Sequence, residues 1–369
     1  MTFSTTDREA AADREAMARA LVLARQGLAT ATPNPRVGCV IVRDGRTVGE
    51  GWHRRAGEPH AEVLALAAAG EAAKGATAYV TLEPCAHFGR TPPCADALIA
   101  AGVARVVAAM EDPNPKVAGR GIARLRAAGL NVECGLLHDE AVELNPGFIS
   151  RMSRQRPWLR LKAAATLDGK TALENGVSQW ITGPEARADG HHWRARACAI
   201  LTGIGTVKAD DPQLSVRALP CERQPLRILI DARLEVDPAA RILQDAPALI
   251  VTASADKTRT QRLASLGHRI LCLPAANGHV ELSALPRELA ALELNEVHIE
   301  AGARLNGALL AADCVDELLL YLAPMALGST ARGIFDLPVL TALDEAHRFD
   351  IRDCAKIGGD LRILARKTI

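Results

Sequence analysis

Four residues within the first 100 positions have the types and spacing needed to bind a metal ion and activate water. Glu62 lies two positions after His60, and Cys85 and Cys94 follow further along the chain. One imidazole and two thiolates would fill three positions of a tetrahedral zinc ion and leave the fourth open to water. Bound zinc lowers the pKa of that water, so hydroxide is available near neutral pH. Glu62 is not needed as a ligand and is predicted to carry protons in a hydrolytic reaction.

This arrangement resembles the zinc site of deaminases, in which H-x-E is followed by P-C-x-x-C. The interval between the cysteines departs from that pattern, because Cys94 lies nine residues after Cys85 and Gly-Arg-Thr-Pro-Pro stands between them. The long interval resembles the deaminase half of the bifunctional deaminase–reductases of riboflavin biosynthesis. The segments Thr32-Pro-Asn-Pro-Arg-Val-Gly38 and Asp112-Pro-Asn-Pro115 extend the resemblance, which covers nearly the whole chain.

The residues leave alternatives open around this site. A closed structural zinc site would need a fourth protein ligand, which His53 or His87 could supply, although the nearby glutamate would then have no role. His87 could also replace His60 as a ligand, but we expect His87 to contact the substrate. Arg90 is either a solvated loop residue or a phosphate contact. Asn34 either initiates a turn or presents its amide to the substrate, and we favour the second role.

Two glycine turns in the second half of the chain follow apparent strands. The apolar run ending at Glu300 leads into a turn that contains Gly302 and Gly307 and then into an apolar helix. The run Leu201-Thr-Gly-Ile-Gly-Thr206 has the same character. A glycine turn that opens a helix lets backbone N–H groups approach a phosphate. These patterns indicate a nucleotide site without the G-x-G-x-x-G fingerprint.

The same half resembles the dihydrofolate-reductase-like domain of that family. The matching segments are Lys162-Ala-Ala-Ala-Thr-Leu-Asp-Gly-Lys170, Ser178-Gln-Trp-Ile-Thr182 and Asp210-Asp-Pro-Gln-Leu214. The resemblance implies NADPH as the cofactor. The residues that it places at the cofactor are Ala164, Trp180, Thr206, Asp210, Gly302, Ala303, Arg304, Leu305, Asn306, Gly307 and Ala308. Those that it places at the substrate are Ser178, Arg194, Leu214, Arg217 and Glu300.

Some roles follow from side-chain chemistry. A guanidinium matches the oxygens of a phosphate, so Arg194 and Arg217 are suited to clamp a sugar phosphate. Lys162 and Asp210 are our candidates for the polar groups near the reacting ribose carbon. For the 2′-phosphate of the cofactor we consider Thr252, which is followed by further hydroxyl and basic residues. Trp180 could also be an ordinary core residue.

The resemblance implies two consecutive reactions. The N-terminal domain would remove the C2 amine of 2,5-diamino-6-(5-phosphoribosylamino)pyrimidin-4-one with a zinc-activated water. The C-terminal domain would then reduce the ribosyl group to ribityl with NADPH, giving 5-amino-6-(5-phosphoribitylamino)uracil. From the family we also expect a homodimer formed through the C-terminal domain.

Composition excludes several classes of protein. The net charge is +1 and aromatic residues make up 3% of the chain, which argues against a nucleic-acid or membrane surface. No apolar run is long enough to span a bilayer, and the N-terminus lacks an apolar signal segment. The nine cysteines do not form a disulfide framework, and we expect a cytoplasmic protein. The cysteines expected to be small core residues are Cys39, Cys134, Cys198, Cys272 and Cys314.

Alternating strand and helix patterns indicate two α/β domains. We expect a cytidine-deaminase-like three-layer α/β/α domain over residues 1–152 and a dihydrofolate-reductase-like α/β domain over 153–369. The metal ligands should lie where strands lead into helices. In the second domain a helix is expected to open with Thr182 as its cap and Pro184 in its first turn.

A different function must be weighed. The zinc site could serve a deaminase of nucleobases or nucleic acid, with a C-terminal domain that only binds. A non-enzymatic scaffold stabilised by metal is a further class. Binding of NADPH would separate the first alternative from the bifunctional enzyme, and the effect of replacing Glu62 would separate the second.

Overall fold

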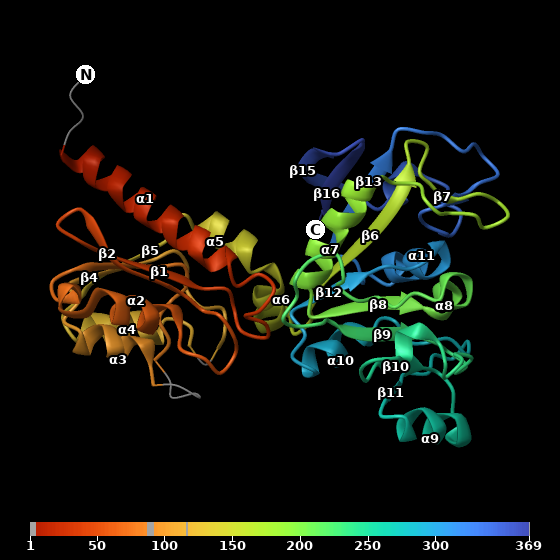
Figure 1. Ribbon diagram of the computed structural model, residues 1–369, viewed down its shortest axis with the longest axis horizontal. Helices are drawn as coiled ribbons and strands as arrows, with labels where there is room; N and C mark the ends of the chain where they lie inside the picture. The colour runs from red at the N-terminus through yellow and green to blue at the C-terminus, as the bar shows by residue number, and fades with distance from the viewer. Residues whose placement is uncertain (1–4, 87–91, 116, 369) are drawn as a thin grey trace. The chain divides into compact units, whose positions relative to one another are not determined.

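The computed structural model describes residues 5–86, 92–115 and 117–368 (Figure 1). The chain divides into two compact units, Met1–Gln155 and Arg156–Ile369, and each is described by itself. None of the helices in the described residues has both the length and the apolar character needed to cross a membrane.

The first unit contains a five-stranded sheet with the strand order β2-β1-β3-β4-β5. Strand β1 pairs antiparallel with β2 and β3, whereas β3, β4 and β5 are mutually parallel. The two-residue hairpin turn Asp44-Gly45 joins β1 to β2. Both residues have positive φ, which Asp-Gly hairpin turns require. The strands are β1 (Gly38–Arg43), β2 (Arg46–Trp52), β3 (Thr77–Val80), β4 (Arg105–Ala108) and β5 (Asn131–Cys134).

Helices cover both faces of this sheet, because successive strand side chains point to opposite faces and both sets are apolar. Helices α2, α3 and α4 bury one set, and α1, α5 and α6 bury the other. This is the three-layer α/β/α arrangement expected from the sequence. The helices are α1 (Thr5–Arg25), α2 (Ala61–Ala69), α3 (Cys94–Ala100), α4 (Arg120–Ala127), α5 (His138–Leu144) and α6 (Pro146–Arg154).

The second unit is built on a nine-stranded sheet with the order β11-β10-β9-β8-β12-β6-β13-β16-β15. The first seven strands in that order are parallel, and β16 and β15 add antiparallel pairings at one edge. The strands are β6 (Trp158–Thr166), β8 (Ala199–Gly203), β9 (Leu226–Ile230), β10 (Leu249–Thr252), β11 (Arg269–Cys272), β12 (Glu296–Ile299), β13 (Glu317–Ala323), β15 (Phe349–Ile357) and β16 (Asp360–Lys367). A separate two-stranded sheet joins β7 (Lys170–Ala172) to β14 (Arg332–Gly333).

Two groups of helices cover the larger sheet. Helices α10 and α11 pack on one face, and α7, α8 and α9 pack on the other. The carboxyl ends of β6, β8, β9 and β12 therefore meet at one edge between the two groups, where α/β proteins place their ligands. The helices are α7 (Pro184–Arg196), α8 (Ile204–Asp210), α9 (Lys257–Ser265), α10 (Leu285–Ala291) and α11 (Ala303–Ala311).

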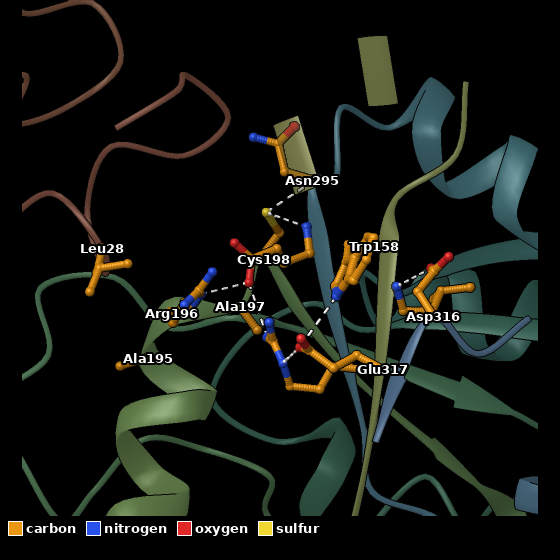
Figure 2. Close-up of polar contacts among 12 residues, drawn as sticks. Leu28, Trp158, Ala195, Arg196, Ala197, Cys198, Asn295, Asp316 and Glu317 are labelled. Carbon is orange, nitrogen blue, oxygen red and sulfur yellow. Dashed lines mark hydrogen bonds and ion pairs between the residues drawn. The ribbon is translucent and has the colours of Figure 1, made fainter. Parts of the chain in front are cut away.

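Two local expectations from the sequence are wrong. Helix α7 is preceded by Gly183, not Thr182, at its N-cap position, and no side chain caps it. Cys134 and Cys272 are exposed, because each ends a strand at the edge of its sheet, where one side meets solvent. The other three cysteines of that set are buried. The sulfur of Cys198 accepts hydrogen bonds from the backbone N–H groups of Asn295 and Glu296 (Figure 2).

Candidate active sites

Three predicted metal ligands lie together in the first unit. His60 directly precedes α2, Cys85 follows β3, and Cys94 is the first residue of α3. One donor atom from each residue lies within 4.8 Å of the other two. His60 and Cys85 are half-buried and Cys94 is fully buried, so the cluster is largely removed from solvent.

The donor set fits a tetrahedral zinc ion. Nδ1 of His60 lies 3.1 Å from Sγ of Cys94 and 3.7 Å from Sγ of Cys85. Ordinary zinc–nitrogen and zinc–sulfur bond lengths at a tetrahedral angle would separate nitrogen from sulfur by about 3.6 Å. Hydrogen bonds from the thiol of Cys94, and then from His60, lower the pKa of Cys85 to about 4. Cys85 is thus predisposed to be the thiolate that a metal requires.

Glu62 lies in the first turn of α2, where only 3% of its surface is exposed. Burial raises the pKa of its carboxyl, although the charge of His60 opposes the change. A carboxyl with a raised pKa, next to the ligand cluster and outside it, is suited to accept and return a proton.

His53 organises the predicted substrate residue Asn34. The amide nitrogen of Asn34 lies 3.0 Å from Nε2 of His53, and Nδ1 of His53 lies 3.2 Å from the carbonyl of Pro59. A neutral imidazole satisfies both contacts when Nδ1 donates to Pro59 and Nε2 accepts from Asn34. His53 therefore has no free nitrogen for a metal, and the amide oxygen of Asn34 remains available for a ligand. From the sequence, His53 was expected only as a possible fourth zinc ligand.

Glu83 is a second residue whose role the sequence did not reveal. Its buried carboxylate accepts backbone N–H bonds from Asp112, Gly119, Gly121 and Ile122, the last two in the first turn of α4. These four bonds fix the segment that leads into Cys85, two positions later. Two features of the sequence could have indicated this role of Glu83. It directly precedes the Pro-Cys pair, and a helix begins further along the chain with backbone N–H groups that need an acceptor. His87 and Arg90 lie outside the described residues.

A large cavity lies in the second unit, at the edge where the parallel strands end. Its volume is about 1360 Å³, above the roughly 300–1,000 Å³ that is usual for one drug-sized ligand, so it has room for more than one small molecule. The predicted catalytic residues Lys162 and Asp210 both line it, from β6 and the end of α8. The other predicted residues that line it are Ala164, Ser178, Thr206, Glu300, Gly302, Ala303, Arg304, Leu305, Asn306 and Ala308.

Several predicted residues are not among those that line the cavity. Gly307 packs on the backbone, since a Cβ there would lie 2.0 Å from the carbonyl oxygen of Asp336. The hydroxyl of Thr252 is buried and donates to the carbonyl of Ala232, which leaves it turned inward. Trp180 is 66% exposed and its ring contacts the guanidinium of Arg187. Arg194, Leu214 and Arg217 are likewise absent from the described lining.

Arg194 already has a carboxylate partner. Its guanidinium makes two hydrogen bonds to Glu300 and one to the carbonyl of Ser215. Burial alone would raise the pKa of Glu300, but the charge and hydrogen bonds of Arg194, together with smaller contributions from His298 and Lys162, outweigh this effect and hold the pKa well below its usual value. Burial lowers the pKa of Lys162, whose ammonium is partly stabilised by Glu300. The wall of the cavity therefore carries a compact set of charges.

Comparison with known proteins identifies both domains. Residues 10–110 match the family model described as the cytidine and deoxycytidylate deaminase zinc-binding region, and residues 157–362 match the RibD C-terminal domain. The riboflavin biosynthesis protein RibD of Escherichia coli strain K12 is 51% identical over 95% of this chain and 98% of its own length. The chain belongs to the RibD family.

Solved structures of RibD proteins have the same fold. A structure of Acinetobacter baumannii RibD is 44% identical and covers 98% of this chain and 100% of its own, with a TM-score of 0.89. A deaminase/reductase structure from Thermotoga maritima is 31% identical with the same coverages and a TM-score of 0.87.

Membership in the RibD family confirms the two expected fold classes and the bifunctional enzyme. The chain is a deaminase and reductase of riboflavin biosynthesis, and its deaminase domain matches a zinc-binding family model and holds a cluster of three metal ligands. A nucleobase or nucleic-acid deaminase with a non-catalytic second domain is not favoured, because the second domain matches the RibD C-terminal domain.

Proposed function

We propose that this protein converts 2,5-diamino-6-(5-phosphoribosylamino)pyrimidin-4-one into 5-amino-6-(5-phosphoribitylamino)uracil in two steps. The observation that carries the proposal is the presence of both sites in one chain: a three-donor metal cluster beside buried Glu62, and a separate cavity lined by Lys162, Asp210 and Glu300. The Thermotoga maritima relative is described as a diaminohydroxyphosphoribosylaminopyrimidine deaminase and 5-amino-6-(5-phosphoribosylamino)uracil reductase, which supports this substrate.

In the first step His60, Cys85 and Cys94 hold Zn²⁺, which when bound makes water a nucleophile near neutral pH. Glu62 takes a proton from the attacking water and passes it to the departing amine, so that water and the C2 amine become a carbonyl and ammonia. The raised pKa of Glu62 suits both directions of this transfer. Asn34, held by His53, accepts a hydrogen bond from the pyrimidine through its amide oxygen.

In the second step the turn Gly302–Ala308 and the end of β8 would hold NADPH, which when bound would supply the hydride needed to reduce C1′ of the ribosyl group. Lys162 delivers a proton to the ring oxygen as the C1′–O bond opens, since its lowered pKa favours release of a proton. Asp210 hydrogen bonds the ribose hydroxyls from the opposite wall. Arg194 and Arg217 bind the phosphate of the substrate. The rest of the substrate is contacted by Ser178, Leu214 and Glu300.

The same proposal includes a homodimer and a cytoplasmic location. Strand β15 forms an edge of the nine-stranded sheet and carries Ile351, which is 67% exposed. The preceding segment exposes Val339 and Leu343 even more fully. Exposed apolar side chains on an edge strand and in the segment that precedes it favour contact with a second copy of the chain. Light scattering would detect the dimer.

The test follows both products in one cuvette. Ammonia should be released from the diaminopyrimidine without NADPH, and absorbance at 340 nm should fall only after deamination. A zinc chelator should stop ammonia release but leave oxidation of NADPH by the deaminated substrate intact. Release of ammonia without any later oxidation of NADPH would overturn the proposed second step.

A further inference from the structure

A buried histidine in the second unit stands next to the charged wall of the reductase cavity. His298 lies in β12, has no exposed surface, and neither ring nitrogen has a hydrogen-bond partner among the described residues. Buried side-chain nitrogens without partners are uncommon in folded proteins and need an explanation. Oε1 of Glu300 lies 3.4 Å from Nε2 of His298.

The strand geometry places these two residues on the same face of the sheet. Alternate residues of a strand share a face, so Glu296, His298 and Glu300 point the same way. The register pairs His298 with Arg160 on β6, and Lys162 follows two residues later on the same face. Helix α7 covers this face and supplies Arg194. His298 is thus enclosed by charged groups from three elements.

Ion pairs link the charged residues at one end of this face of the sheet. The guanidinium of Arg160 bonds both Glu317 and Glu296, and Arg196 also bonds Glu296. Trp158 donates its ring N–H to Glu317 at 3.3 Å (Figure 2). Glu296 and Glu317 are held by arginines at this end, and Glu300 lies within 3.4 Å of His298 at the other.

The ring of His298 is neutral, because burial lowers its pKa and the positive charges of Arg160 and Arg194 oppose protonation, while Glu300 favours it. A neutral imidazole carries one N–H, on either nitrogen. In the tautomer with the hydrogen on Nε2, this nitrogen lies within hydrogen-bonding distance of Oε1 of Glu300, and a rotation of either side chain would align the two groups.

We propose that His298 is a positioning residue for the reductase reaction: it donates Nε2–H to Glu300 and holds that carboxylate against the cavity. Glu300 lines the cavity, whereas His298 does not. Substrate phosphate that binds Arg194 competes with Glu300 for the same guanidinium, and His298 keeps the carboxylate in place when that partner is shared. The inference rests on the proposed reductase function.

The test compares three purified full-length variants with the wild-type enzyme. His298→Leu and His298→Met remove the donor with little change in volume, and His298→Gln keeps an N–H. Loss of one hydrogen bond to a charged group should raise the KM of the deaminated substrate by about tenfold or more in the apolar variants. We expect kcat to change less than KM, and His298→Gln to stay within about threefold of the wild type. Ammonia release is the internal control and should not change.

A matched variant separates positioning from packing. His268 is also buried in this unit, where its Nδ1 accepts from the backbone of Ala248, remote from the cavity lining. His268→Leu should lower thermal stability but leave the KM of the reductase unchanged.

Two results would overturn the inference while the proposed function stands: apolar variants that match the wild-type KM, or an apolar variant that performs better than His298→Gln. If His298→Leu does not fold, His298→Met gives the same comparison. A wild-type enzyme that fails to oxidise NADPH would instead overturn the proposed function itself.

Discussion

Arg194 and Glu300 form a two-point ion pair, with Nε 2.5 Å from Oε1 and Nη2 2.8 Å from Oε2, and Glu300 also lines the reductase cavity. Both side chains are about 15% exposed, so the pair is largely removed from solvent. The sequence predicted both residues as substrate contacts, but it did not predict that they bind one another. The pair is a preformed site in which the guanidinium can bind an anionic ligand and the carboxylate can accept a hydrogen bond from a ligand hydroxyl.

Replacing Glu300 by Gln should leave the charge of Arg194 uncompensated in this wall. Breaking a buried ion pair by removing one partner costs about 3 kcal/mol or more, so the second unit should become less stable. The rate of NADPH oxidation should fall at least about tenfold, and ammonia release should persist. The measurements are a thermal melt and the two product assays. Equal loss of both activities would point to global unfolding and contradict a local role.

Replacing Glu62 by Gln should keep the shape of the first turn of α2 and remove the proton carrier. Ammonia release should fall by about a hundredfold or more, the usual contribution of a positioned acid–base group. Zinc content, measured by elemental analysis, should remain at the wild-type ratio because Glu62 is not among the three ligands. Oxidation of NADPH by substrate that is already deaminated provides the control. An unchanged rate of ammonia release would rule out the proton-carrier role.

Replacing His53 by Phe removes the acceptor that orients the amide of Asn34. The amide would be free to rotate, and the KM of deamination should rise by roughly five- to tenfold, as for the loss of one neutral hydrogen bond. Zinc content should not change. A loss of zinc from this variant would instead show that His53 supports the metal, with its ring centroid 5.2 Å from that of His60.

The sequence predicted the metal site well and the reductase site only in part. His60, Glu62, Cys85 and Cys94 lie in two short segments whose types and order already state a chemistry, and the structure brings the ligands together. Arg194 and Glu300 are separated by 106 positions, so their contact depends on how α7 packs on β12. Such pairings arise from tertiary packing, which no local pattern specifies.

Local signals also failed where a neighbour decided the outcome. Thr182 has the right side chain for a helix cap, but Gly183 occupies the N-cap position, where its backbone N–H donates to Asp360 on a strand near the end of the chain. Glu83 looks like an ordinary surface carboxylate in the sequence, yet it accepts four backbone hydrogen bonds from distant residues. Both cases show that backbone groups find their partners across the fold.

Gly121 tests how closely α4 supports the metal site. A Cβ at this position would lie 1.8 Å from the carbonyl oxygen of Pro84, directly before Cys85. Gly121→Ala should therefore displace the segment that carries Cys85 and weaken zinc binding, which a competition titration with a chelator would measure. Gly190→Ala is the matched control, since a Cβ there meets nothing within 4 Å among the described atoms and alanine favours a helix. Equal zinc affinity in both variants would contradict the expected clash.

The pH dependence of the reductase tests the role of Lys162. Burial, and then the charge of Arg194, lower the pKa of this amine below its ordinary value of 10.5, while Glu300 opposes the change. A step that needs the protonated amine is fully active at low pH and is lost as the pH rises through the lowered pKa. The kcat/KM for NADPH-dependent reduction should therefore decline at a pH below 10.5. Lys162→Arg places a cation there that stays protonated, because the pKa of arginine exceeds about 12. The remaining reductase activity of that variant should not decline at alkaline pH. Ammonia release should have the same pH profile in both proteins. An alkaline decline that persists unchanged in Lys162→Arg would assign it to another group.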